Sequence, residues 1–271
     1  MRALSYLRPK SLATALQALS EDPQAKFLAG GQTLLPALKL RLAAPTRLID
    51  LQAIAELRGV SVAARHLQIG AMTTHAEVAR DADVCRLLPA LGALAGGIGD
   101  RMVRNLGTLG GSIVNNDPAA DYPAALVGLN AVVVTTRRRL PASKFFRGLY
   151  ETALDADELV TAVEFPVARR AAYVKFKNPA SRFAIVGVMV AETDEGPRVA
   201  VTGAGSVPFR VPAYERALSR NFCAQALEGV VTEFGALNSD LHASAEYRAH
   251  LIPEITRRAA LEAARVIKRG E

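Results

Sequence analysis

The chain has 271 residues, half of them hydrophobic, which is enough to bury a substantial core in one large domain or two. Its net charge of +7 is spread along the sequence, and the absence of low-complexity tracts, long blocks of like charge and heptad arrays disfavours disordered and fibrous classes. No apolar run approaches the roughly 18 residues of a membrane-spanning helix, and the first ten residues lack the apolar run of a signal peptide, so we expect a cytoplasmic protein without a transmembrane segment.

The first fifty residues predict a small α/β unit. We expect strands at Leu4–Leu7, Ala25–Leu28 and Arg47–Leu51 and helices over residues 12–19 and 34–42. Ser11 can cap the first of these helices. The second strand runs directly into Gly30 and Gly31, so the turn from strand to helix carries the first glycine pair.

A second α/β unit is expected to follow. Its predicted elements are strands at His66–Ala71, Ala131–Thr136 and Leu159–Phe165, helices at His75–Arg80, Leu87–Leu94 and Tyr122–Leu129, and an ordered loop over Ile98–Asn116. Thr73 and Thr74 offer caps to the first of these helices. The basic run Arg137–Arg139 is interpreted as a hairpin tip, where charge limits the pairing of exposed edges.

A plausible domain boundary lies at Pro166–Arg170, and the rest of the chain reads as strands followed by helices. We expect strands at Ala172–Lys177, Ala184–Glu192 and Arg198–Gly203, and helices at Val211–Leu218, at Cys223–Phe234 and in a long final segment through Leu261 and Val266. Glu195-Gly196-Pro197 predicts a hairpin. The whole chain is therefore α+β, with a first domain of residues 1–166 in two lobes (about 1–53 and 54–166) and a small three-stranded C-terminal domain of residues 167–271.

The cysteines and histidines predict no metal site. Cys85 and Cys223 are far apart and form no C-x-x-C pair, so neither an iron–sulfur cluster nor a structural zinc is expected in this chain. The four histidines form no metal-binding pattern, and each is interpreted as a solvated or core-edge residue. Nucleic-acid binding is not expected either, because no basic cluster has aromatic residues interleaved.

Two glycine-rich segments, Ala29–Thr33 and Thr108–Ser112, are the residues that favour a ligand. Exposed backbone N–H groups in such segments can converge on a pyrophosphate, and glycine lets the phosphate oxygens approach them closely. Taken alone, each segment is also compatible with an ordinary turn. Neither matches the nicotinamide fingerprint G-x-G-x-x-G or the P-loop, so the pair is more informative than either member.

These segments resemble the two FAD loops of the flavoproteins of carbon monoxide dehydrogenase and xanthine dehydrogenase. The first loop matches Phe27–Pro36 (FLAGGQTLLP), and the second matches Arg104–Ser112 (RNLGTLGGS) followed by Asn116–Pro123 (NDPAADYP). The resemblance covers essentially the whole chain and includes Gly70–His75 (GAMTTH) and Asp157–Leu159. It implies a two-lobed FAD-binding domain of the vanillyl-alcohol-oxidase-like, PCMH type, followed by that family's C-terminal domain.

The resemblance also implies noncovalent FAD, with the pyrophosphate between the two loops. Asp121 matches an acidic position on the adenosine side, Ile98 and Leu159 match apolar lining positions, and Lys175 matches a lysine near the flavin, where a cation would stabilise the reduced ring. The cofactor-binding residues so expected are Ala29, Gly30, Gly31, Gln32, Thr33, Leu34, Ile98, Thr108, Leu109, Gly110, Gly111, Ser112, Asp121, Leu159 and Lys175. No catalytic residue is expected.

Each carried-over residue has a purely structural alternative. Asp121 could cap the helix that follows it, while Ile98 and Leu159 could be ordinary core residues. Lys175 and Lys177 share one strand face at i, i+2, and the preference for Lys175 comes from the resemblance alone.

Within such a family, the chain would be an electron-transfer subunit. A molybdopterin-binding large subunit would oxidise the substrate, a [2Fe-2S] small subunit would pass electrons to FAD, and the flavin would deliver them to an external acceptor, in a dimer of heterotrimers. Two other functions stay open, namely a self-sufficient noncovalent FAD oxidase and a scaffold subunit that has lost its cofactor. The substrate of the assembly does not follow from this chain.

Overall fold

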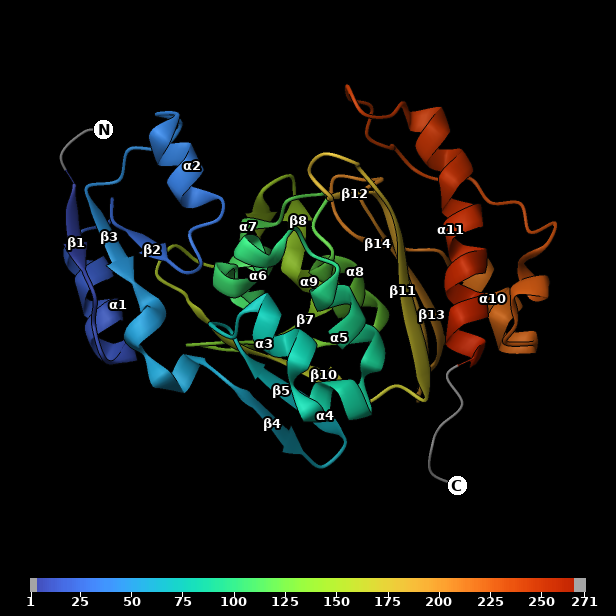
Figure 1. The fold of residues 1–271 in the computed structure, drawn as a ribbon, viewed down its shortest axis with the longest axis horizontal. Helices are drawn as coiled ribbons and strands as arrows, with labels where there is room; N and C mark the ends of the chain where they lie inside the picture. Colours follow the sequence, from blue (N-terminus) through green and yellow to red (C-terminus); the bar gives the residue numbers. More distant parts are fainter. Residues whose placement is uncertain (1–3, 266–271) are drawn as a thin grey trace.

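The computed structural model describes residues 4–265. Its first lobe is a three-stranded parallel sheet with the order β1-β3-β2, flanked by two helices (Figure 1). These elements are β1 (Ser5–Leu7), α1 (Leu12–Glu21), β2 (Lys26–Leu28), α2 (Leu34–Lys39) and β3 (Arg47–Asp50). Ser11 caps α1 by accepting a hydrogen bond from the Thr14 amide, as predicted, and the glycine pair does lie in the turn from β2 to α2.

The second lobe is a five-stranded antiparallel sheet with the order β4-β5-β10-β6-β7 and a layer of helices against it (Figure 1). The strands are β4 (Val60–Ala63), β5 (His66–Gly70), β6 (Val132–Thr135), β7 (Arg139–Pro141) and β10 (Val160–Pro166). The helices are α3 (His75–Arg80), α4 (Ala82–Leu87), α5 (Pro89–Gly96), α6 (Arg101–Leu106), α7 (Leu109–Asn115), α8 (Tyr122–Gly128) and α9 (Ala142–Phe145). A two-stranded hairpin, β8 (Phe146–Gly148) and β9 (Glu151–Thr152), follows α9.

The C-terminal part is a four-stranded antiparallel sheet with helices on its outer face (Figure 1). Its elements are β11 (Arg170–Lys177), β12 (Ala184–Thr193), β13 (Gly196–Thr202), β14 (Phe209–Arg210), α10 (Pro212–Arg220), a 3-10 turn (Ala224–Leu227) and α11 (Ala245–Arg265). The predicted β12–β13 hairpin forms, and it turns at Asp194 and Glu195, directly before Gly196.

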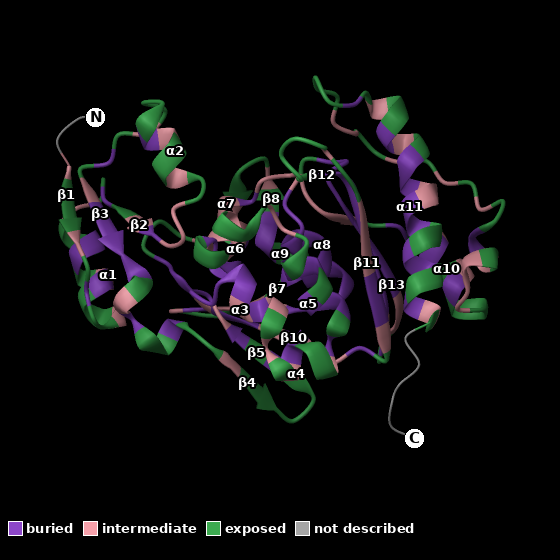
Figure 2. Cartoon of the chain, in the orientation of Figure 1, coloured by how far each residue is buried: buried purple, intermediate pink, exposed green. Residues whose placement is uncertain are grey.

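Strand β12 is apolar along most of its length because both of its faces are covered. Alternate residues of a strand point to opposite sides of the sheet. Met189 and Ala191 join the core formed with the helices of the second lobe, while Val188 and Val190 join the core under α10 and α11. In Figure 2 helix α8 is buried throughout, whereas β4 is mostly exposed. The C-terminal sheet and the second lobe therefore share one core.

Three sequence-based expectations about elements were wrong. The segment Ile98–Asn116, expected to be a loop, contains α6 and α7, which are capped by Asp100 and Thr108 and are too short to show a helical period. Most of Cys223–Phe234 is irregular, and only a four-residue 3-10 turn forms there. The C-terminal sheet also gains a fourth, two-residue strand.

Other expectations were confirmed or lie beyond what can be tested. Thr74 caps α3 in a capping box with Glu77, and Arg137 and Arg138 lie in the β6–β7 hairpin turn. The expected end of the last helix at Val266 lies outside the described residues. Between residues 4 and 265, no helix combines the length and the apolar character that crossing a bilayer requires. The domain boundary at 166/167 stays a prediction.

Gly128, at the end of α8, sets how closely this helix approaches the C-terminal sheet. A Cβ built on Gly128 would lie 2.7 Å from Cγ of Met189 and 3.4 Å from Cβ of Ala200. We therefore expect Gly128→Val to lower the free energy of unfolding by about 1–3 kcal/mol through overpacking. Denaturant titration measures this change. Gly235→Val is the matched control, because nothing lies within 4 Å of its Cβ position, and equal losses in the two variants would contradict the proposed close packing.

Candidate functional site

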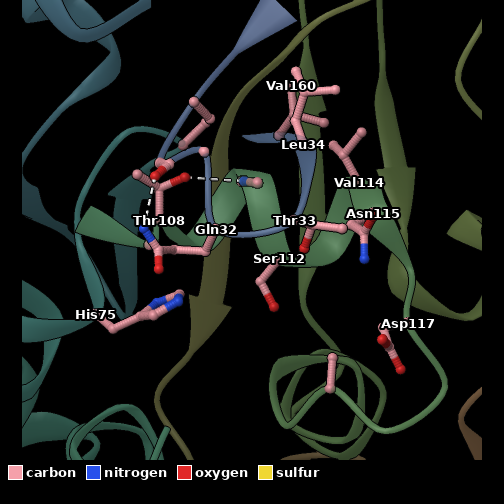
Figure 3. A pocket seen from close by; sticks show the side chains of 18 of the residues that line it. Gln32, Thr33, Leu34, His75, Thr108, Ser112, Val114, Asn115, Asp117 and Val160 are labelled. Carbon is pink, nitrogen blue, oxygen red and sulfur yellow. Dashed lines mark hydrogen bonds between the residues drawn. The ribbon is translucent and has the colours of Figure 1, made fainter. Parts of the chain in front are cut away.

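A cavity of about 510 Å³ lies where the two lobes and the C-terminal sheet meet. Figure 3 shows Val160 at one side of the cavity and His75 at the other, with the polar side chains of Gln32 and Ser112 between them. The walls come from four parts of the chain that are far apart in sequence. These are residues 26–34 with Leu51, residues 71–75 with 98–121, residues 150–160, and the loop 181–183 between β11 and β12.

The first glycine segment lines this cavity, and its backbone N–H groups are not used by the protein. Gly31 has φ +71°, a left-handed conformation that glycine adopts without strain. The N–H groups of residues 30–33 have no hydrogen-bond partner within the described part of the chain. Around them lie the hydroxyl of Thr33 and the side chain of Gln32, whose Nε2 donates to the Gly30 carbonyl at 3.2 Å. This segment can therefore bind an anionic group through its backbone.

The second glycine segment differs, because its N–H groups are already used by the protein. The N–H groups of Leu109 and Gly110 donate to carbonyls in Ala71–Thr73 at 3.0 and 2.8 Å. The N–H of Gly111 donates to Oγ1 of Thr108, the N-cap of α7, at 3.1 Å. The expectation that exposed N–H groups of both segments converge on a phosphate is thus wrong for these three residues, because the segment runs alongside residues 71–75 and caps its own helix.

The glycines of the two segments are required mainly because backbone packs directly against backbone. A Cβ on Gly30 would overlap the Leu106 carbonyl, and it would lie 2.7 Å from Cα of Gly107. A Cβ on Gly110 would lie 2.6 Å from Cβ of Ala71. Real side chains do not reach such distances. Gly30 therefore lets the first lobe contact the second beside the cavity, whereas Gly110 lets α7 pack against Ala71 within the second lobe.

The cavity is lined by all of the residues expected from the sequence except Leu109 and Lys175. Leu109 is fully buried in the core of the second lobe. Lys175 lies behind the wall, where its Nζ donates to Oδ2 of Asp121 at 2.9 Å and to the Arg182 carbonyl at 2.9 Å. Which of these residues contact a cofactor stays a prediction.

Asp121 and Lys175 form a buried ion pair, and Tyr173 completes it by donating to Oδ1 of Asp121 at 2.5 Å. Burial disfavours the charged carboxylate and raises the pKa of Asp121, although Lys175 and Tyr173 offset part of this effect. The carboxylate makes no capping hydrogen bond to α8, so the helix-cap alternative is wrong. Because Asp121 and Lys175 touch, they cannot serve opposite ends of an extended cofactor, which contradicts the expected adenosine-side and flavin-side assignments as a pair.

A second buried carboxylate, that of Glu158, shapes the wall beside Leu159. It accepts hydrogen bonds from Nη2 of Arg138 at 2.7 Å and from the hydroxyl of Thr135 at 2.6 Å. These bonds lower the pKa of Glu158 to about 2, with Arg138 as the main cause favouring the charged form. The basic run at the hairpin tip therefore has a specific structural role, since one of its arginines holds the turn that positions a cavity residue.

His75 was missed by the sequence reasoning, which treated it as a solvated or core-edge residue. It lines the cavity, has an exposed fraction of only 4%, and packs against Tyr122 with 5.4 Å between the ring centroids. Burial lowers its pKa to about 4, and the positive charge of Arg104 adds to this effect. The one sequence signal was its place in Gly70–His75, directly after two threonines, of which Thr74 caps α3.

Comparison with known proteins gives consistent relatives. A family model described as the FAD binding domain in molybdopterin dehydrogenase matches residues 2–168. The medium subunit of nicotine 6-hydroxylase from Paenarthrobacter nicotinovorans is 35% identical over 96% of this chain and 97% of its own. The medium chain of carbon monoxide dehydrogenase from Hydrogenophaga pseudoflava is 33% identical over 94% of both chains.

Solved structures agree with these sequence relatives. Carbon monoxide dehydrogenase from Hydrogenophaga pseudoflava superposes with a TM-score of 0.87 at 33% identity and covers 96% of this chain and 97% of its own. Quinoline 2-oxidoreductase from Pseudomonas putida 86 superposes with a TM-score of 0.85 at 30% identity and covers 98% of both chains.

The buried ion pair gives a prediction with a matched control on the same strand. Lys175→Met leaves the Asp121 carboxylate buried without a cation and is expected to lower the free energy of unfolding by about 3 kcal/mol. Lys177→Met, two residues further along β11 at an exposed position, should change it by less than about 0.5 kcal/mol. Chemical denaturation compares the two. Equal losses would contradict a specific role of Lys175, and Asp121→Asn in the Lys175→Met background should recover part of the loss.

The lowered pKa of His75 predicts a pH-dependent stability. An unfolded chain binds a proton at this histidine near pH 6.5, whereas the folded chain resists it until about pH 4. Stability should therefore be complete above pH 6.5 and fall by up to about 3 kcal/mol as the pH drops to 4. His75→Gln should remove this part of the dependence, while the exposed His66→Gln should retain it. Unfolding free energies measured between pH 7 and 4 test this prediction. Identical pH profiles for the wild type and His75→Gln would contradict the lowered pKa of His75.

Proposed function

This chain belongs to the family of FAD-binding domains of the molybdopterin dehydrogenases, and we propose that it holds FAD in the cavity between its lobes and transfers electrons as the medium subunit of a molybdenum hydroxylase. The observation that carries this proposal is the set of backbone N–H groups at residues 30–33, which have no hydrogen-bond partner among the described residues and belong to a segment lining a cavity of cofactor size. A cofactor site of about 510 Å³ is typical in size, and this one combines a few polar groups with apolar walls.

The residues present fit the two halves of such a dinucleotide. The unused N–H groups of residues 30–33, with the hydroxyls of Thr33 and Ser112, suit a diphosphate and add no cation that would over-neutralise it. Buried apolar side chains at one side of the cavity, Leu51, Met72 and Leu159, suit an adenine ring. The chemistry that FAD supplies when bound is electron transfer in steps of one or two electrons.

The flavin half is proposed to lie at the Asp121 side of the cavity. An electron-transfer ring has to be reachable by its redox partners, and the wall on this side includes Phe183, which is 46% exposed. Phe183 adjoins Arg182, whose carbonyl accepts the hydrogen bond from Lys175. Lys175 thus keeps its predicted place near the flavin. Its ion pair with Asp121 leaves little net charge there, so we expect its effect on the reduced ring to be modest.

Partner subunits supply the other redox centres in this proposal. Several relatives are named medium chains or medium subunits, which supports a multi-subunit assembly. With two cysteines in separate parts of the sequence, the chain has no ligand set for an iron–sulfur cluster. We infer a [2Fe-2S] small subunit as electron donor and a molybdopterin-binding large subunit as the site of substrate oxidation. A dimer of heterotrimers and a cytoplasmic location stay predictions.

The proposal is tested by flavin content. Coproduced with its partner chains, the wild-type protein should carry about one FAD per copy, measured by its absorbance after release. Ser112→Phe places a ring in the cavity and should weaken FAD binding at least about tenfold. Ser143→Phe, at an exposed position on α9 outside the cavity, is the matched control and should keep its flavin.

Two outcomes would replace the proposal with its alternatives. A wild-type complex that contains no flavin and rejects added FAD would indicate a scaffold subunit. Reduction of the flavin by an organic substrate of the complex, in this chain alone and without partners, would indicate a self-sufficient oxidase. Flavin reduction that requires both partner chains supports the electron-transfer role.

A further inference from the structure

His75 has one ring nitrogen enclosed by protein and one that borders the cavity. Its Nδ1 is buried and has no hydrogen-bond partner among the described residues. Its Nε2 lies beside Gly107, where an added Cβ would come within 2.7 Å of it, and it too has no partner in that part of the chain. Figure 3 shows the imidazole extending from its backbone toward the space below Gln32 and beside Ser112.

These surroundings select one tautomer of the neutral ring. A proton on Nδ1 would be an unpaired buried donor, which costs about 1–3 kcal/mol, whereas a lone pair there costs less. The proton therefore belongs on Nε2, and a donor N–H is directed into the cavity. The backbone at His75 is held in place, because its N–H donates to the Gly107 carbonyl at 2.9 Å and Thr74 forms an isolated β-bridge with Thr108.

The groups around the ring favour the neutral form. Arg104, on α6, is a cation close enough to lower the pKa of His75, and Tyr122, on α8, packs against the ring with its own hydroxyl buried. Burial alone already disfavours the imidazolium. A diphosphate bound directly to this ring would favour the charged form instead, so the site suits an uncharged acceptor.

We propose that His75 is a cofactor-binding residue, whose Nε2–H donates a hydrogen bond to an oxygen or nitrogen acceptor on the flavin half of FAD. The position of His75 supports a contact with the flavin half, which is proposed to lie at the Asp121 side. His75 packs against Tyr122, which follows Asp121 directly in the chain, and Val160 lies at the far side of the cavity from His75 (Figure 3). The inference rests on the proposed FAD function and adds a specific donor to it. Gly107 is the glycine that makes room for this ring.

Two polar substitutions separate the donor atom from the bulk of the side chain. Glutamine can place its amide N–H near the position of Nε2, whereas asparagine reaches only the position of Nδ1. Neither introduces a charge or an apolar surface, so both variants are expected to fold. His66→Asn, at an exposed position on β5, is the matched control. The full chain is freed of flavin, and its dissociation constants for FAD, FMN and ADP are measured by flavin fluorescence and calorimetry.

The three ligands locate the contact within the cofactor. We expect His75→Asn to weaken FAD and FMN binding by about two- to tenfold, the effect of one neutral hydrogen bond, and to leave ADP binding unchanged. His75→Gln and His66→Asn should bind all three ligands like the wild type. Equal affinities of the asparagine and glutamine variants for FAD would overturn the proposal.

Loss of ADP affinity in the same proportion as FAD would also overturn it, because the contact would then lie at the diphosphate or the adenosine. Failure of the wild-type chain to bind FAD at all, even within the assembled complex, would instead contradict the proposed function itself. The two failures are therefore distinguishable.

Discussion

The close contact of two backbone segments, Gly30–Gly31 and Leu106–Gly110, is the constraint on which the cavity depends. Each segment belongs to a different lobe, and no side chain separates them at Gly30. Hydrogen bonds from Leu109 and Gly110 to residues 71–73 then hold the second segment rigidly in its own lobe. The first segment lines the cavity, and its N–H groups at residues 30–33 have no partner among the described residues.

The two segments consequently have different tasks, although their sequences look alike. The first supplies unused donors, and its helix α2 begins beside them. The second is structural, because its N–H groups donate hydrogen bonds within the cap of α7 and to the carbonyls of residues 71–73. A third part of the molecule, the C-terminal sheet, closes the cavity through the ion pair of Lys175 with Asp121. This pair lies under the wall, and the second lobe and the C-terminal sheet also share one core, so damage to either part is expected to affect both.

The sequence predicted the elements with strong local patterns and failed where the pattern was short or absent. The strands β10, β11, β12 and β13, a helix cap at Thr74 and the glycine turn after β2 were all predicted correctly. Helices α6 and α7 were missed because six or seven residues hold less than two turns. Cys223–Phe234 was overpredicted because apolar residues there pack under α10 and α11 without forming a regular helix.

The sequence by itself determined that two glycine segments follow strand and loop positions in a fixed order, and nearly all of the residues expected from it do line the cavity. Tertiary structure alone decided which amides stay free, why Asp121 and Lys175 pair, and that His75 is buried with one nitrogen facing the cavity. The physical reason is that these facts depend on contacts between residues far apart in the chain, such as Asp121 and Lys175, which are separated by 54 positions. Local spacing reports which face of an element is apolar, but it does not report what lies against that face.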